Sequence, residues 1–151
     1  MVKRLEEAGI KNPAVLSALE RVPRHKFIDE ALDSRAYELM SLPIGYGQTI
    51  SHPFIVGRLC EHIFQELPLQ RVLEIGSGCG YQAAVLSQIS NEVFSVERNI
   101  NLLSEARIRL RKMGYRNVHL RHADGYSGLK KMAPFDAIIV TAAAEFVPDI
   151  L

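Results

Sequence analysis

The sequence has little cysteine, no long apolar run and almost no net charge, and each of these shortages excludes a class of protein. The two cysteines, Cys60 and Cys79, form neither a disulfide framework nor a C-x-x-C metal pair, which favours a reducing, cytoplasmic setting. No apolar run is long enough to span a bilayer, and residues 1–7 lack the apolar core of a signal peptide. The formal net charge of +1 gives no general reason to expect a nucleic-acid partner. We therefore expect a soluble intracellular protein with no membrane or nucleic-acid partner.

What remains is the composition of one globular domain. With 48% hydrophobic and 23% charged residues among 151, the chain can bury a substantial core. Residues 1–35 are predicted to be helical, with one helix opening at Asn12-Pro13, where a capping residue precedes a proline. Residues 36–52 are rich in proline and glycine and predict a long loop without regular structure, a kind of segment that is usually functional. A further helix is predicted to open at Pro53.

From residue 71 onward the pattern alternates between strands and helices. The predicted strands cover 71–75, 93–97, 118–121 and 136–141, and the predicted helices cover about 80–90 and 100–113. The first and last strands are nearly continuous apolar runs, as expected for a parallel sheet that is covered on both faces. The alternation predicts an α/β fold with a Rossmann-like, doubly wound, mostly parallel sheet and an N-terminal helical extension. In such a sheet, ligands bind at the carboxyl ends of the strands.

The predicted sheet is incomplete. A Rossmann-type sheet normally continues for roughly two or three more strands, whereas this sequence stops as a helix opens at 147–151. The apolar strand at 136–141 then has an unpaired edge, which favours aggregation. We therefore expect a truncated version of a longer protein. Residues 1–70 form a helical segment and substrate loop, packed in one domain with an incomplete cofactor-binding core at 71–151. The chain is expected to be monomeric if complete and to self-associate if truncated.

Residues 72–81, which read VLEIGSGCGY, are the most informative stretch. An apolar run ends in three glycines at alternate positions, and an amphipathic segment follows. Strand, glycine-rich turn and helix together present backbone N–H groups to an anionic ligand. The spacing is G-x-G-x-G, one residue shorter than the dinucleotide fingerprint G-x-G-x-x-G, and Glu74 lies two residues before the first glycine. This pattern resembles the S-adenosylmethionine-binding loop of the class I methyltransferases.

Two further groups fall at the ends of the next strands, where one nucleotide could contact them all. Glu97 lies about 20 residues beyond the glycine loop, the place of a carboxylate that binds ribose hydroxyls. Asp124 can accept a hydrogen bond from an amino group such as that of adenine, and Gly125 lets the ring lie against the backbone. Each also has a structural interpretation, because Glu97 could cap a helix and Asp-Gly is a common turn pair. Jointly, their order and spacing favour a nucleotide-type cofactor. The candidate cofactor residues are Glu74, Gly76, Ser77, Gly78, Gly80, Glu97, Asp124 and Gly125.

The loop at residues 42–51 reads LPIGYGQTIS and resembles the signature loop of the protein-L-isoaspartate O-methyltransferases. Further resemblance to that family, in the same order, is found at residues 21–27, 72–82, 124–125 and 136–143. The resemblance implies methyl transfer from S-adenosyl-L-methionine to the free carboxylate of L-isoaspartyl residues in damaged proteins, which starts their repair to aspartyl residues. It also implies that isoaspartyl proteins and peptides are the partners, that Ser51 has the active-site role, and that Thr49 lies at the site.

Methylation of a carboxylate needs no general base, because a pKa of about 3.5 leaves the group ionised at neutral pH. The anion attacks a sulfonium cation and both charges fade, so a site that excludes water and orients the partners favours the reaction. Thr49 and Ser51 supply hydroxyl groups in a loop that enters a helix at Pro53, where an anion is favoured. Alternatively, Ser51 only caps that helix. His52 is interpreted as exposed in the loop, with no role as a base.

The other polar residues have ordinary interpretations. His119 and His122 are expected on opposite faces of a strand, so no metal site is predicted. The basic run at 107–112 is interpreted as a solvated helix face, and Cys79 as a small spacer in the glycine loop. In relatives, a proline follows the strand at 136–143 within a residue or two, whereas here it is delayed to position 148, which alters a loop that borders the site.

Two other functions stay open. The first is a catalytically inactive remnant that binds the cofactor weakly or associates with other chains through its open strand edge. The second is a class I methyltransferase that acts on RNA or on a small molecule. The near-neutral charge and the loop at 42–51 argue against the second function.

Overall fold

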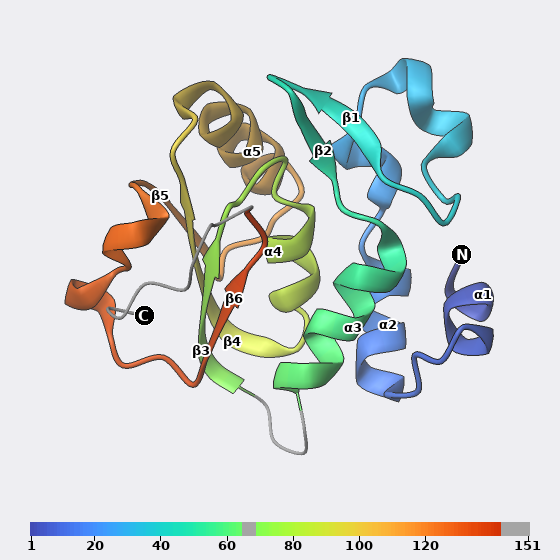
Figure 1. Ribbon diagram of the computed structural model, residues 1–151, viewed down its shortest axis with the longest axis horizontal. Coiled ribbons are helices and arrows are strands. Elements are labelled where there is room, and N and C mark those ends of the chain that lie inside the picture. Colours follow the sequence, from blue (N-terminus) through green and yellow to red (C-terminus); the bar gives the residue numbers. More distant parts are fainter. Residues whose placement is uncertain (65–68, 143–151) are drawn as a thin grey trace.

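The computed structural model describes residues 1–64 and 69–142 (Figure 1). Its centre is a four-stranded sheet with the strand order β5-β4-β3-β6, in which every pair is parallel. Val72 of β3 pairs with Val93 of β4 on one side and with Ala137 of β6 on the other. The predicted strands and the Rossmann-like α/β fold are therefore confirmed. The strands are β3 (Leu69–Ile75), β4 (Ser90–Glu97), β5 (Val118–His122) and β6 (Ala137–Val140).

Both predicted helices between these strands are present, although the first ends at Leu86 instead of near residue 90, where β4 begins. Asn99 caps the start of α5, and Gly114, with a φ of 81°, follows its last turn, as the sequence predicts. The connection from β5 to β6 contains two short 3₁₀ helices. The connecting elements are α4 (Tyr81–Leu86), α5 (Ile100–Lys112), η3 (Gly125–Ser127) and η4 (Lys130–Met132).

Apolar side chains cover both faces of the sheet because neighbouring residues of a strand point to opposite faces. Val72 and Val93 belong to the larger core cluster, which includes buried residues of α4 and α5. Leu73 and Phe94 belong to a second cluster, against which side chains from residues 123–138 pack. Figure 1 shows α4 on one side of the sheet and the orange segment with η3 and η4 on the other. This two-sided cover explains why the strands read as apolar runs.

The N-terminal part is helical, as predicted. Asn12 caps α2, because its Oδ1 accepts from the N–H groups of Ala14 and Val15 at 2.9 and 3.3 Å. Helix α2 packs against α3 and also against α4, so this part and the sheet share the larger core cluster. The elements are α1 (Val2–Glu7), α2 (Pro13–Arg21), η1 (Arg24–Phe27), η2 (Glu30–Arg35) and α3 (Pro53–Ile63).

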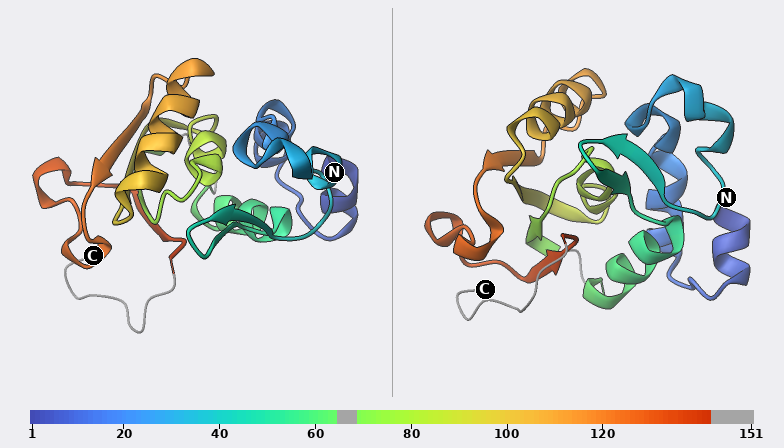
Figure 2. Two further views of the ribbon diagram at one scale, coloured as in Figure 1. Left: turned by 90° about the horizontal axis from the view of Figure 1, so that it is seen from above. Right: turned by 45° about the horizontal axis from the view of Figure 1, so that its top comes forward.

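The prediction of an irregular loop over residues 36–52 is wrong in part. The segment contains an antiparallel hairpin of β1 (Leu42–Gly45) and β2 (Gln48–Ile50). Tyr46 and Gly47 have φ values of 52° and 68°, and positive values at both positions are typical of tight hairpin turns. The proline and glycine that suggest irregular structure thus belong to a short two-stranded sheet. Figure 2 shows this hairpin between the N-terminal helices and the parallel sheet.

Strand β6 lies at an edge of the described sheet, and Val140 is 37% exposed. Two predicted features lie outside the described residues: the helix opening at 147–151 and the delayed proline at 148. Within residues 1–64 and 69–142, no helix has the length and apolar character that a membrane span needs.

Candidate functional site

A pocket of about 360 Å³ lies at the carboxyl ends of the parallel strands, where this fold places ligands. The glycine loop, the segments that follow β4 and β5, and the hairpin strand β2 with the residue after it contribute to its wall. Every predicted site residue except Gly80 lines the pocket. These residues are Thr49, Ser51, Glu74, Gly76, Ser77, Gly78, Glu97, Asp124 and Gly125. One cavity therefore joins the candidate cofactor residues to both candidate catalytic hydroxyls.

Backbone hydrogen bonds fix the glycine loop to the neighbouring strand. The N–H groups of Gly76 and Ser77 donate to the carbonyl oxygen of Val96 at 2.8 and 3.1 Å. Gly76 has a φ of 102°, and a Cβ at this position would lie 3.0 Å from the backbone nitrogen of Ala142. A larger residue is therefore strained here. Gly80 lies outside the pocket wall and packs closely against α5 instead.

Thr141, which also lines the pocket, was not among the predicted site residues. Its Oγ1 lies 2.9 Å from the carbonyl oxygen of Ile75 and 2.7 Å from that of Gly76. The hydroxyl therefore holds the start of the glycine loop from the side of β6. The available sequence signal is a hydroxyl residue directly after the apolar run of that strand.

Glu97 ties the end of β4 to the glycine loop. Its Oε2 accepts from the N–H of Gly78 at 2.9 Å, and its Oε1 accepts from the N–H of Asn99 at 2.9 Å. Each carboxylate oxygen can accept a second hydrogen bond, so the side chain can still bind a hydroxyl group in the pocket. Glu97 is buried and does not cap α5, whose cap is Asn99, so the interpretation as a helix cap is wrong, whereas the predicted ribose role fits this geometry.

Glu74 is completely buried beneath the glycine loop. Its Oε2 accepts from the hydroxyl of Ser95, and the Ser95 and Ser77 hydroxyls are 2.5 Å apart. Burial, together with the nearby negative charge of Glu97, raises the pKa of Glu74 to about 8, although the hydrogen bond from Ser95 opposes this shift. Its Oε1 is buried and has no hydrogen-bond partner among the described residues. A polar group in the pocket could satisfy that oxygen. Ser95 was not predicted, although a serine inside an apolar strand is a usable signal.

Asp124 and Gly125 follow β5 in a turn. Asp124 Oδ1 accepts from the N–H of Tyr126 at 3.0 Å and opens η3, so the turn interpretation describes its local geometry. A Cβ on Gly125 would lie only 2.3 Å from Cγ2 of Ile75. The backbone of this pocket residue therefore lies directly on the sheet, with no room for a methyl group.

Ser51 does not cap the helix that follows it, so that alternative is wrong. The cap of α3 is His52, whose Nδ1 accepts from the N–H of Phe54 at 3.1 Å. His52 is half-buried, and its interpretation as an exposed loop residue is also wrong. Because another side chain caps the helix, the Ser51 hydroxyl is not needed for that purpose, and Ser51 lines the pocket.

The remaining polar residues have structural partners. The His119 ring lies 4.9 Å from the Phe94 ring, and His122 Nε2 lies 3.0 Å from the carbonyl oxygen of Arg98. No cluster of three or more potential metal ligands occurs in the described part of the chain. Arg109, predicted to be solvated, is half-buried and donates to the carbonyl oxygen of Cys79 at 3.0 Å.

A parallel sheet in this order, with a glycine loop after β3 and carboxylates at the ends of the next two strands, defines a Rossmann-like protein of the class I methyltransferase type. The family model of protein-L-isoaspartate(D-aspartate) O-methyltransferase (PCMT) matches residues 1–151. The chain belongs to this family.

Relatives and solved structures agree with this assignment. A protein-L-isoaspartate O-methyltransferase of Methylobacillus flagellatus is 59% identical over 98% of this chain and 66% of its own length. The Nitrosomonas eutropha enzyme is 54% identical over the whole chain and 69% of its own length. The chain thus spans about two thirds of the length of these relatives.

Two solved structures cover 99% of the chain. One is a protein-L-isoaspartate O-methyltransferase with 30% identity and a TM-score of 0.90, of which this chain covers 49%. The other is a Plasmodium falciparum protein described as a beta-aspartate methyltransferase, in complex with S-adenosyl-L-homocysteine. It has 24% identity and a TM-score of 0.84, and this chain covers 75% of it.

Proposed function

We propose that this chain transfers a methyl group from S-adenosyl-L-methionine to the free carboxylate of L-isoaspartyl residues in damaged proteins. The observation that carries the proposal is the single pocket that joins the glycine loop to Thr49 and Ser51. Family membership supports the choice of substrate, and a pocket lined by the glycine loop, Thr49 and Ser51 supports adjoining places for cofactor and substrate. The methyl ester reverts to a succinimide, which gives normal aspartate a chance to re-form.

The pocket fits the proposed cofactor on three observations. Glu74 has a buried oxygen without a partner in its wall, suited to a polar group of the ligand. Glu97 keeps acceptor capacity for ribose hydroxyls, and Asp124 keeps it for an adenine amino group. Gly125 lines the pocket with its backbone packed directly on Ile75, which suits a ring that lies against that backbone. When bound, S-adenosylmethionine supplies a methyl group on a sulfonium cation.

The residues of the chain then have to orient a carboxylate that is already ionised. We assign the hydroxyls of Thr49 and Ser51 to hydrogen-bond that carboxylate and aim one of its oxygens into the pocket. No residue has to remove a proton. Exclusion of water by the hairpin and the glycine loop favours the encounter of an anion with a cation. The proposed partners are isoaspartyl proteins and peptides.

The proposed setting of the enzyme is the cytoplasm. Both cysteines are free and buried, a usage typical of reducing compartments.

The direct test measures transfer of labelled methyl groups to a pair of peptides, one with isoaspartate and one with normal aspartate. We expect label in the isoaspartyl peptide alone. Binding of S-adenosyl-L-homocysteine, measured by calorimetry, shows separately whether the pocket is formed. If the protein is folded and binds S-adenosyl-L-homocysteine but labels neither peptide, the proposal is overturned in favour of an inactive cofactor-binding chain. Label in RNA would redirect it to another substrate class.

The Ser51→Ala substitution tests the assigned hydroxyl. Because a hydrogen bond to a charged group contributes about 1.5–3 kcal/mol, methyl transfer should fall about 10- to 100-fold. The dissociation constant of S-adenosyl-L-homocysteine should change less than about twofold, since the substitution spares the predicted cofactor residues. Ser104→Ala is the matched control, because that hydroxyl donates to the carbonyl oxygen of Ile100 on the exposed surface of α5. Unchanged turnover of Ser51→Ala would contradict the assignment.

A further inference from the structure

Arg24 is fully buried, which is unusual for an arginine. It begins the 3₁₀ helix η1 and lies outside the pocket wall. A buried cation is costly unless hydrogen-bond acceptors surround it. The groups that accept hydrogen bonds from Arg24 therefore show which part of the chain it holds in place.

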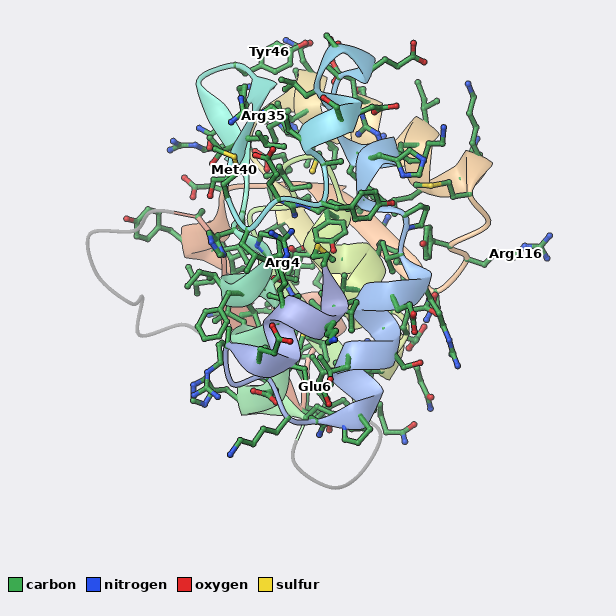
Figure 3. The ribbon with its side chains drawn as sticks, turned by 90° about the vertical axis from the view of Figure 1, so that its right-hand side faces the viewer. Arg4, Glu6, Arg35, Met40, Tyr46 and Arg116 are labelled. Atoms are coloured by element: carbon green, nitrogen blue, oxygen red, sulfur yellow. The ribbon has the colours of Figure 1, made fainter. Side chains whose placement is uncertain are left out.

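The guanidinium donates three hydrogen bonds to backbone carbonyls of one segment. Nε donates to Ala36 at 2.9 Å, and Nη2 donates both to Met40 at 3.2 Å and to Ser51 at 2.9 Å. Met40 precedes β1 and Ser51 follows β2, so one nitrogen joins the two ends of the hairpin. Figure 3 labels Met40 near this base and Tyr46 at the far tip.

The same guanidinium also contacts the cofactor side of the site. Its Cζ lies 4.8 Å from the centroid of the Tyr81 ring, a cation–π distance. Tyr81 is the first residue of α4, directly after the glycine loop, and it lines the pocket. The Phe27 ring packs edge-on against Tyr81 at 5.4 Å, so this ring is held from two sides.

From these contacts we propose that Arg24 is a positioning residue for methyl transfer: it fixes the backbone at Ser51 relative to the glycine loop. The inference rests on the proposed function for its catalytic readout. It explains why a charged group is kept in a core where an apolar side chain would also fill space. The planar fork satisfies three carbonyls and lies against a ring at once, which an ammonium on a flexible stem cannot do.

The test compares Arg24→Lys with Arg71→Lys. Arg71 is a matched control because its Cζ lies 4.8 Å from the Phe94 ring and its Nη1 donates to the carbonyl oxygen of Pro134 at 3.3 Å. It belongs to β3 before the buried stretch that leads to the glycine loop, and it does not line the pocket. Both substitutions keep the charge and replace a guanidinium that lies over a ring and donates to a backbone carbonyl, fully buried at Arg24 and half-buried at Arg71. Loss of a guanidinium as such should therefore affect both proteins.

For Arg24→Lys we expect kcat for the isoaspartyl peptide to fall about 10- to 100-fold, because small misplacements of a reacting group have effects of that size. The dissociation constant of S-adenosyl-L-homocysteine should stay within about threefold. Amide exchange at residues 40–51 should become at least about tenfold faster, with β3 and β4 unchanged. Arg71→Lys should show neither change, whatever its melting temperature.

Equal losses of kcat in the two variants, or unchanged exchange at residues 40–51 in Arg24→Lys, would overturn the inference. Failure of the proposed function is recognised separately, because unsubstituted protein would then leave the isoaspartyl peptide unlabelled. In that event the amide-exchange rates and the dissociation constant of S-adenosyl-L-homocysteine alone test the role of Arg24. Faster exchange at the hairpin with unchanged affinity supports the positioning role, and any other result overturns it.

Discussion

The pocket keeps its shape at Gly125 only because this residue has no side chain. Its backbone φ lies outside the left-handed region, so alanine is acceptable there on conformational grounds. The obstacle is Cγ2 of Ile75, 2.3 Å from where a Cβ would stand. Ile75 ends β3 and is held in the sheet, so it cannot move away without disturbing the glycine loop.

Gly125→Ala should therefore lower the free energy of unfolding by about 1–3 kcal/mol, the usual cost of overpacking, and weaken binding of S-adenosyl-L-homocysteine. Urea denaturation and calorimetry measure the two effects. The control is the same substitution in an Ile75→Ala background, which removes Cγ2. There the added cost of Gly125→Ala should shrink markedly. Equal costs in both backgrounds would show that the contact with Ile75 is not the cause.

Site residues that lie at the ends of strands could be predicted from the sequence. Residues that bond to the backbone of distant segments could not. Glu97 and Asp124 were found because parallel strands bring their carboxyl ends to one edge. Arg24 was missed as a positioning residue because its partners are carbonyl groups, which every residue carries and no sequence pattern marks. Thr141 also contacts backbone carbonyls, and its sequence signal is a hydroxyl residue directly after an apolar strand.

Among the elements, the hairpin β1–β2 is the one that the sequence analysis did not predict. Its tip is fastened to α5, because the hydroxyl of Tyr46 donates to Oε1 of Glu105 at 2.9 Å. That hydrogen bond raises the pKa of Tyr46. Ile44 also approaches the glycine loop, since its Cδ1 would lie 3.5 Å from a Cβ at Gly78. The hairpin is thus held at its base by Arg24 and at its tip by Tyr46.

Tyr46→Phe should loosen the tip without disturbing the core. Amide exchange across residues 42–50 should accelerate by several-fold, while the melting temperature stays nearly unchanged, because the lost hydrogen bond is at the surface. Hydrogen-exchange mass spectrometry and a thermal melt test this. Tyr37→Phe is the control, since its hydroxyl lies 2.6 Å from Nδ1 of His25, outside the hairpin. Similar hairpin exchange in both variants would argue against a fastening by Glu105.

The helices and parallel strands were predictable because each repeats an apolar pattern over several residues. The hairpin strands are too short for such a pattern, and their proline and glycine point to irregular structure. The turn is marked by positive φ values at three successive residues, Gly45, Tyr46 and Gly47, and the sequence does not display these directly.

At the scale of the whole molecule, Glu74 links stability to pH. Burial raises its pKa from 4.5 to about 8, and Ser95 and Glu97 are the groups that face it. Between these values the unfolded chain has released this proton and the folded chain has kept it. The free energy of unfolding should therefore fall as the pH rises, by at most about 1.4 kcal/mol per pH unit from this group.

Urea denaturation at pH 5, 6, 7 and 8 measures this dependence, and Glu74→Gln should flatten it because glutamine does not ionise in that range. The comparison between the two proteins at each pH cancels the contributions of all other groups. A Glu74→Gln protein with the same slope as the unsubstituted chain would show that Glu74 is ionised in the folded state.

The whole topology was predictable as a class, because alternating strands and helices leave few arrangements. The side of β3 on which β6 pairs was not, since no local pattern records it.

That pairing has a consequence for the nascent chain. Thr141, whose hydroxyl holds the glycine loop, is 65 residues beyond Gly76. At about 5–20 residues per second, a ribosome needs roughly 3–13 s to travel between them. During that interval the chain has made β3 and its loop but not the strand and hydroxyl that complete them. The pocket is therefore among the last parts of the described chain to form during translation, and its ligand can stabilise only a chain whose synthesis has passed this residue.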